Sequence, residues 1–266
     1  MFSASSFFDL SDFAHRALFA ENEPVWAALK QLKGYMNGLN YSQFRHERLQ
    51  DGVPLPCPLI FHEGKLQTTE GCEIVYGDTN KGKLRVSRAG QELTGASVLM
   101  AGAVFMGSRI LLGKGVLIES GALIKEPAVF GDCTEVRQGT YVRGYCLTGS
   151  RCVVGHATEV KHSIFFNDAK AGHFAYLGDS ILGGAANLGA GTKFANLRFL
   201  PGNVQIKTPD GPIDSGLRKF GAILGDRVQT GCNSVTNPGT LLGSDSLLLP
   251  NTTAPSGYHS AKSVLG

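Results

Sequence analysis

The chain has little charge, a single tryptophan and no long apolar run. Charged residues make up 18% of its 266 positions and the formal net charge is +3. That balance is too mild to indicate a nucleic acid or a membrane surface as partner. No run of about eighteen apolar residues occurs, so we expect no membrane span. Residues 1–10 lack the basic start and apolar stretch of a secretory signal, and we expect a cytoplasmic protein.

Cysteine is present but forms no framework. The six cysteines include no Cys-x-x-Cys pair. Their spacing therefore indicates neither a disulfide scaffold nor a zinc site, and we predict no metal. Cys146 and Cys152 lie six residues apart, and we expect them to pack in the core on successive faces rather than to pair.

Glycine is abundant, with 35 residues, and positions 94–165 divide without a gap into twelve hexads. Ten of the twelve first places are apolar: Thr94, Met100, Met106, Leu112, Ile118, Ile124, Phe130, Val136, Val142, Thr148, Val154 and Val160. The fifth places are all small or β-branched, and glycine and charged residues gather between them. A period of six fits neither a helix nor a simple strand. It is typical of a β-solenoid, whose stacked coils bury one another's apolar sides.

The remaining parts of the chain are less regular. We expect an N-terminal helical and irregular region (1–93), a solenoid (94–250) with protruding loops at 166–176 and 198–223, and a loosely held polar tail (251–266).

Within the N-terminal region, Asp9 or Ser11 is predicted to cap a helix that ends near Ala20. A second helix, with Trp26 in its apolar stripe and Gly38 as its stop, should cover the solenoid end or a neighbouring subunit. Strands are expected at 74–76 and 84–86, flanking a turn.

The hexads resemble those of the hexapeptide-repeat acyltransferases, which fold as left-handed parallel β-helices with three hexads, or eighteen residues, in each coil. The resemblance therefore implies a mainly β protein of that fold. Residues eighteen apart should then stack on adjacent rungs about 4.8 Å apart. Lys125, Arg143 and Lys161 have this spacing and would form a column of cations. The column is either a solvated surface or a phosphate site.

A sharper resemblance covers Glu159 to Asn196. It is to the acetyltransferase domain of the bifunctional glucosamine-1-phosphate acetyltransferase/N-acetylglucosamine-1-phosphate uridylyltransferase family. The matching phrases are Glu159-Val160-Lys161, Lys170-Ala171-Gly172-His173, Tyr176-Leu177-Gly178-Asp179, Ala186-Asn187-Leu188-Gly189-Ala190-Gly191-Thr192 and Asn196. A histidine on a loop beside a basic column also suits general-base chemistry near pH 7.

The resemblance implies a role for each matching residue. His173 is the implied catalytic base, Arg143 and Lys161 hold the sugar phosphate, and Tyr176 and Asn187 hold the sugar. Ala190, Asn196 and Cys232 are implied at the acetyl-CoA end. The resemblance further implies an acetyl-CoA-dependent N-acetyltransferase acting on a small-molecule sugar phosphate such as glucosamine 1-phosphate, and a homotrimer with shared sites.

The sequence departs from the family in two places. The family usually continues with Asn-Tyr-Asp-Gly where this chain has Asn196-Leu197-Arg198-Phe199, so the donor contact of the tyrosine is missing. No glycine-rich nucleotide loop precedes the hexads, so a pyrophosphorylase activity is not expected. The chain looks most like a stand-alone subgroup described as sugar-phosphate nucleotidyltransferase-like. The resemblance also suggests a separate uridylyltransferase as a partner.

Three other interpretations remain open at this stage. In the first, the chain is a non-catalytic sugar-nucleotide-binding scaffold. In the second, it is an acyl-carrier-protein-dependent acyltransferase of lipid A synthesis with His156 as its base. A zinc-dependent carbonic anhydrase would use His156, His162 and His173, although their spacings of 6 and 11 are not those of that family.

Overall fold

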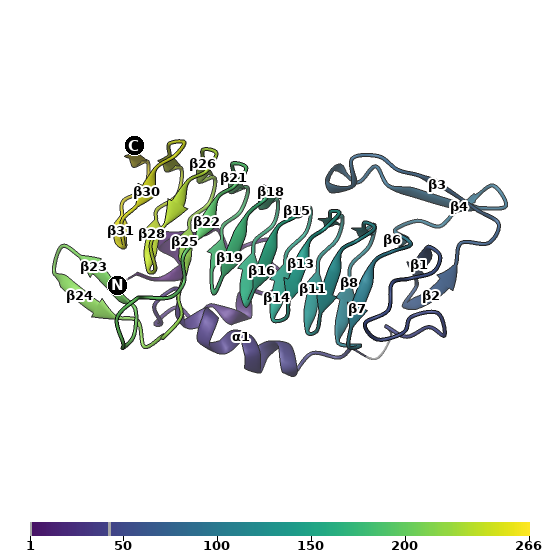
Figure 1. Cartoon of the computed structure of the whole chain (residues 1–266), viewed down its shortest axis with the longest axis horizontal. Helices are drawn as coiled ribbons and strands as arrows, with labels where there is room; N and C mark the ends of the chain where they lie inside the picture. Colours follow the sequence, from purple (N-terminus) through teal and green to yellow (C-terminus); the bar gives the residue numbers. More distant parts are fainter. Residues whose placement is uncertain (1, 42–43) are drawn as a thin grey trace.

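The computed structural model describes residues 2–41 and 44–266. Its centre is a parallel β-solenoid with three faces, which the chain visits in turn (Figure 1). Face 1 contains β6 (Ser97–Leu99), β9 (Leu117–Ile118), β12 (Glu135–Val136), β15 (Val153–His156), β18 (Lys170–His173), β21 (Asn187–Leu188), β26 (Gln229–Thr230), β29 (Leu247–Leu248) and β32 (Val264–Leu265).

The other two faces follow the same order along the solenoid. Face 2 contains β7 (Val104–Met106), β10 (Leu123–Lys125), β13 (Tyr141–Arg143), β16 (Glu159–Lys161), β19 (Tyr176–Gly178), β22 (Lys193–Phe194), β27 (Val235–Thr236) and β30 (Thr253–Ala254). Face 3 contains β8 (Ile110–Leu112), β11 (Ala128–Phe130), β14 (Cys146–Thr148), β17 (Ser163–Phe165), β20 (Ile181–Leu182), β25 (Ala222–Leu224), β28 (Thr240–Leu242) and β31 (Gly257–His259). We name each corner by the two faces that it joins.

The core is a set of inward stripes, one for each face. On face 2 the stripe from β10 to β22 is fully buried and consists of Ile124, Val142, Val160, Leu177 and Phe194. These residues alternate with outward ones, most of which are polar, because neighbouring side chains of a strand point to opposite sides. The predicted β-helix is thus confirmed, and its left-handed sense stays a prediction.

The hexad frame needs a correction at its start. Phe105, not Met106, is opposite the inward Ile124, and Leu99, not Met100, is opposite the inward Ile118. Paired residues are nineteen apart here and eighteen apart at Ile110 and Ala128. The extra residue lies in the corner before Ile110. Residues before that corner are therefore shifted by one place relative to the predicted hexads.

The predicted loop at 166–176 is wrong, because the solenoid continues through it. Lys170 of β18 lies opposite Val153 of β15 in a parallel pair. Paired residues are eighteen apart at Tyr141 and Glu159 but seventeen apart from Cys146 and Ser163 to Tyr176 and Lys193. Corner 2–3 is one residue shorter in this coil than in the coil before it. His162 alone forms the corner between β16 and β17, with a left-handed φ of +47°. The shifted frame made a regular strand resemble a loop.

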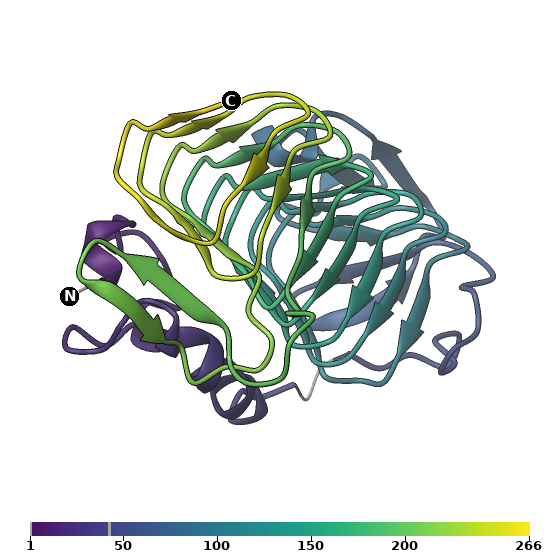
Figure 2. The ribbon, with the colours of Figure 1, turned by 60° about the vertical axis from the view of Figure 1, so that its left-hand side comes forward.

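The second predicted loop is present. One coil needs 42 residues to pass from Ile181 to its partner Ile223. The excursion carries an antiparallel hairpin of β23 (Gln205–Thr208) and β24 (Gly211–Asp214), which projects from the solenoid beside the N-terminal segment (Figure 2).

The N-terminal segment covers the outer side of face 3. The predicted helix from Asp9 or Ser11 to Ala20 is wrong, since only short 3-10 turns form, at Ala4–Ser6 and Arg16–Leu18. Four phenylalanines of this segment are instead buried against face 3. Of these, Phe8 and Phe13 stack on Phe166 with centroid distances of 4.4 and 4.0 Å. Such burial outweighs local helix propensity.

The second N-terminal helix is confirmed as α1 (Ala27–Asn37), followed by Gly38. Trp26 is 3% exposed and packs in the same cluster as Val129, Leu147 and Ile164 of face 3. It therefore covers a side of the solenoid and not its end.

Strands extend the solenoid at its N-terminal end. β1 (Leu59–His62) and β2 (Lys65–Thr68) extend face 1 as an antiparallel hairpin. The expected strands near 74–76 and 84–86 are β3 (Cys72–Val75) and β4 (Arg85–Arg88), with β5 (Gln91–Glu92) beside β4.

The predicted loose tail at 251–266 is also wrong. β30, β31 and β32 complete a further coil, with Thr253 opposite Val235 and Val264 opposite Leu247. Polar side chains at the corners hid this coil, because a solenoid corner is polar wherever it meets solvent.

Candidate active site

The predicted cations share one column on the outer side of face 2. Lys125 is directly opposite Arg143. Val142 is opposite Val160, so Lys161 follows on the next rung. The shared face arises from the eighteen-residue coil and the alternation of side chains along each strand.

Two of the three cations are balanced by carboxylates. Arg143 Nη1 donates to Glu159 Oε1 at 2.7 Å. Lys161 Nζ donates to both oxygens of Asp179, at 3.2 and 3.1 Å. The repulsion expected between stacked cations is thereby relieved.

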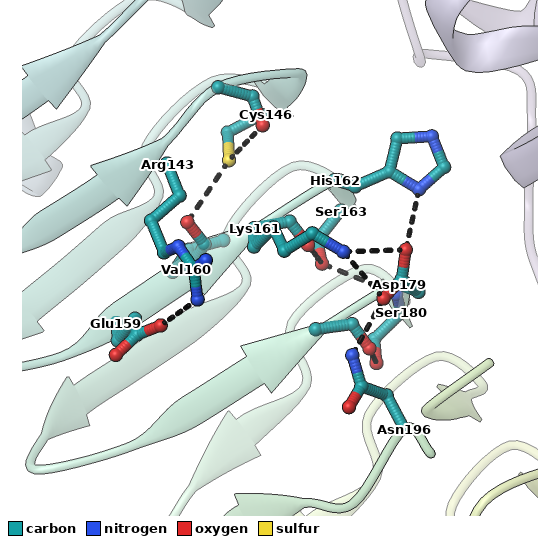
Figure 3. Close-up of polar contacts among 12 residues, drawn as sticks. Arg143, Cys146, Glu159, Val160, Lys161, His162, Ser163, Asp179, Ser180 and Asn196 are labelled. Atoms are coloured by element: carbon teal, nitrogen blue, oxygen red, sulfur yellow. Dashed lines mark hydrogen bonds and ion pairs between the residues drawn. The ribbon is translucent and has the colours of Figure 1, made fainter. Parts of the chain in front are cut away.

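Asp179 is the centre of this network (Figure 3). It is 6% exposed and stands at corner 2–3 with a left-handed φ of +52°. Besides Lys161, its carboxylate accepts from Asn196 Nδ2 at 2.6 Å and lies 3.0 Å from His162 Nδ1. Burial raises the pKa of this carboxyl, but the His162 hydrogen bond, the Lys161 charge and the Asn196 amide together hold the pKa below its usual value.

His162 was considered only as a zinc ligand in the sequence, and its contact with Asp179 was missed. Its Nδ1 faces Asp179 and its ring meets Tyr145 edge-on at 6.3 Å. Its Nε2 is buried without a hydrogen-bond partner among the described residues. His162 reaches Asp179 because it is the only residue of its corner. The signal in the sequence that could have shown this is the coil of seventeen residues in place of eighteen.

His173 stands apart from that network, at corner 1–2. It ends β18, is exposed, and lies opposite His156 of β15. Within the described chain, no side-chain hydrogen bond restrains its ring. His156 is more constrained, because its Nδ1 lies 3.0 Å from the Gln138 carbonyl and its ring packs edge-on against Phe174.

The residues assigned to the acyl donor lie partly on the same corner. Gly191 N–H donates to the His173 carbonyl at 3.0 Å, and Asn233 N–H donates to the Ala190 carbonyl at 2.8 Å. His173, Ala190 and Cys232 therefore follow one another along corner 1–2. In the described residues the Ala190 N–H has no acceptor, while Cys232 is exposed.

Tyr176 and Asn187 start from the two faces that flank His173. Tyr176 is opposite Glu159 on face 2, and Asn187 is an exposed residue opposite Lys170 on face 1. Burial raises the pKa of Tyr176, and the nearby carboxylates of Glu159 and Asp179 add to this effect. A β-carbon at Gly178 would collide with the Asn196 amide and the Tyr176 hydroxyl, so a larger residue there would displace these two side chains.

Asn196 lies at the far end of β22 from Ala190 and Cys232. Its side chain binds Asp179, and its carbonyl accepts from Phe220 N–H at 2.9 Å. The structure therefore groups Asn196 with Lys161 and Asp179 rather than with the other donor-site candidates. Beyond it, the fully exposed Phe199 borders a cavity of about 360 Å³ between the excursion and Asn237.

The three histidines of the carbonic anhydrase hypothesis do not converge. His156 and His173 occupy corner 1–2, whereas His162 is at corner 2–3 with β16 between them. Over residues 2–41 and 44–266, no group of three or more His, Cys, Asp or Glu side chains is arranged to hold a metal. None of the helices in this part of the chain is long and apolar enough to cross a membrane.

No family model matches the chain. A stretch of 111 residues is 37% identical to a bifunctional sugar-1-phosphate nucleotidylyltransferase/acetyltransferase of Sulfurisphaera tokodaii, and it covers 42% of this chain and 28% of that protein. A 111-residue stretch is also 40% identical to the bifunctional protein GlmU of Methanococcus maripaludis, covering 42% of this chain and 27% of that protein. The chain thus matches little more than a quarter of the length of these curated relatives.

Among solved structures, one of a GDP-perosamine N-acetyltransferase variant from Caulobacter crescentus, in complex with CoA and GDP-perosamine, aligns with 60% of this chain and 53% of that chain. The sequence identity is 18% and the TM-score is 0.28, a likeness too low to relate the two sites.

Proposed function

We propose that this chain transfers an acetyl group from acetyl-CoA to the amine of an amino-sugar phosphate, with glucosamine 1-phosphate as the first acceptor to test. The observation that carries the proposal is the arrangement across the outer side of face 2. Arg143 and Lys161 offer cations for a phosphate on that face, and the exposed His173 stands at the adjoining corner. The acetyltransferase named in the relative from Sulfurisphaera tokodaii supports it.

In the proposed reaction His173 is the general base. Its neutral imidazole accepts a proton from the sugar amine, whose nitrogen attacks the thioester carbonyl carbon. The nitrogen–carbon bond forms first and gives a tetrahedral oxyanion. The carbon–sulfur bond then breaks as the carbonyl re-forms, and the departing thiolate takes up the proton from His173 as CoA thiol. The Ala190 N–H, which has no acceptor within the described residues, would donate to the oxyanion. Tyr176 and Asn187 would hold the sugar.

The proposal includes a homotrimer acting in the cytoplasm. His173 stands exposed on a corner of the solenoid, and an outward corner does not exclude water from a reaction by itself. A second copy would supply the opposite wall. Light scattering of the purified chain should give a trimer, and a monomer would contradict the shared site. An acetylated sugar 1-phosphate would then serve a separate uridylyltransferase.

Arg143→Ala should raise the KM for glucosamine 1-phosphate about tenfold, because a hydrogen bond to a charged group contributes about 1.5–3 kcal/mol. The kcat should change little, since the phosphate is bound equally in ground and transition states. Release of CoA thiol from acetyl-CoA measures both constants. Arg151→Ala is the matched control, because Arg151 pairs with Asp168 on another corner. Absence of thiol release by the unaltered chain with every amino-sugar phosphate tested would favour the scaffold interpretation.

Cys232 provides a test of the donor site. It is exposed, whereas burial raises the pKa of both Cys146 and Cys152 to about 12. Alkylation at pH 8 should therefore modify Cys232 in the native protein and leave the two buried thiols unmodified until denaturation. Acetyl-CoA should slow the Cys232 reaction in proportion to the fraction of sites filled. An unchanged rate at saturating acetyl-CoA would place the donor elsewhere.

A further inference from the structure

Lys125 is a third cation on face 2, and the site described above does not use it. It is opposite Arg143 and partly exposed. Unlike Arg143 and Lys161, it forms no ion pair with any described carboxylate. Its neighbour Glu126 is already occupied, because one oxygen accepts from Arg109 Nε at 3.0 Å and the other from Ser108 N–H at 2.8 Å. Lys125 thus retains an unbalanced positive charge.

The three cations cannot all serve one phosphate group. The outer two lie two rungs apart, which is about 10 Å along the face, and their ammonium groups lean to opposite edges. Lys161 Nζ is bound to Asp179 at corner 2–3. Lys125 Nζ lies 5.4 Å from the centroid of the Tyr141 ring, in the other outward column of face 2. Arg143 is between them, 5.9 Å from the same ring.

We infer that the acceptor carries a second phosphoryl group and that Lys125 binds it, which makes the substrate an amino sugar linked to a diphosphate, the chemistry that a nucleoside-diphosphate amino sugar offers. This inference rests on the proposed function for its chemistry. Lys161 and Arg143 hold the phosphate next to the sugar, and Arg143 and Lys125 hold the next phosphate one rung further on. Glu159 and Asp179 already balance Arg143 and Lys161, so an anion spanning two rungs gains most at Lys125, the cation without a carboxylate partner among the described residues.

The first experiment measures binding and needs no activity. Calorimetry with inorganic phosphate and with pyrophosphate should show that the unaltered chain prefers pyrophosphate by about tenfold. Lys125→Met should lose most of this preference, and Lys125→Arg should keep it. Pyrophosphate carries more charge than phosphate, so any lysine of the protein favours it to some extent. Lys114→Met is the control for this general electrostatic effect, because Lys114 lies away from face 2 at the corner after β8. An equal loss for both anions in Lys125→Met would overturn the inference.

The second experiment measures acetyl transfer to UDP-glucosamine and to glucosamine 1-phosphate. The expected result is a higher kcat/KM for the diphosphate acceptor and a loss of about tenfold in Lys125→Met for that acceptor alone. Acetylation of the monophosphate only would refute the inference and leave the proposed function intact. If neither acceptor is acetylated, the proposed function fails, and the pyrophosphate measurement still decides the role of Lys125.

Discussion

Replacement of His173 by alanine should lower kcat for acetyl transfer by about 10²–10⁴-fold, the usual contribution of general-base catalysis. The side chain is exposed and unrestrained by hydrogen bonds in the described chain, so its removal should leave thermal unfolding unchanged. The KM for the acceptor should change little, because Arg143 and Lys161 are untouched. Thiol release at saturating acetyl-CoA measures the loss.

His156→Ala is the matched control, since His156 lies opposite His173 on the preceding rung. Under the proposed mechanism this variant keeps most of its activity. If His156→Ala lost the activity and His173→Ala retained it, the acyl-carrier-protein-dependent alternative with His156 as base would be favoured. Normal turnover in His173→Ala would mean that another group removes the proton.

The second large effect is expected from Asp179. Asp179→Ala should lower the free energy of unfolding by about 3 kcal/mol, the lower end of the range for removing one partner of a buried ion pair. The lower end applies because the Lys161 side chain is 25% exposed whereas that of Asp179 is 8% exposed. Lys161, His162 and Asn196 all lose their acceptor in this variant. Urea denaturation at pH 7 measures the difference.

The pH dependence of this loss has a definite sign. The folded-state pKa of Asp179 is lowered, so its contribution is complete above the unfolded value of about 3.9 and disappears as the pH falls through the folded value. The gap between Asp179→Ala and the unaltered chain should therefore be constant near neutrality and shrink below about pH 4. Asp245→Ala removes an exposed partner of Arg227 and should change stability little. A gap that widened in acid would contradict the proposed charge state.

Some of the site was predictable because a solenoid converts sequence spacing directly into distance. Lys125, Arg143 and Lys161 recur every eighteen residues, and the parallel rungs bring them to one face. The same rule predicted the inward stripes. It failed at two corners, where one residue more or less moves every later side chain by one place. Periodicity does not report such a change until the strands are paired.

The contacts of Asp179 were not predictable from that rule. In the sequence, Asp179 only belonged to one of the motifs that carry the family resemblance. Its contacts with His162 and Asn196 depend on a corner that consists of a single residue. The short 3-10 turns of residues 2–20 arose for a similar reason. Their phenylalanines gain more from Phe166 and the apolar outer side of face 3 than a local helix would provide.

The sequence by itself determined the repeating strand, the choice of inward residues over most of the solenoid and the alignment of the cations. Those properties depend only on periodicity and on the alternation of side chains along a strand. The tertiary structure decided where the frame slips, what covers face 3 and which carboxylate holds Lys161. Each of these depends on contacts between residues far apart in the chain, and local pattern carries no information about their relative energies.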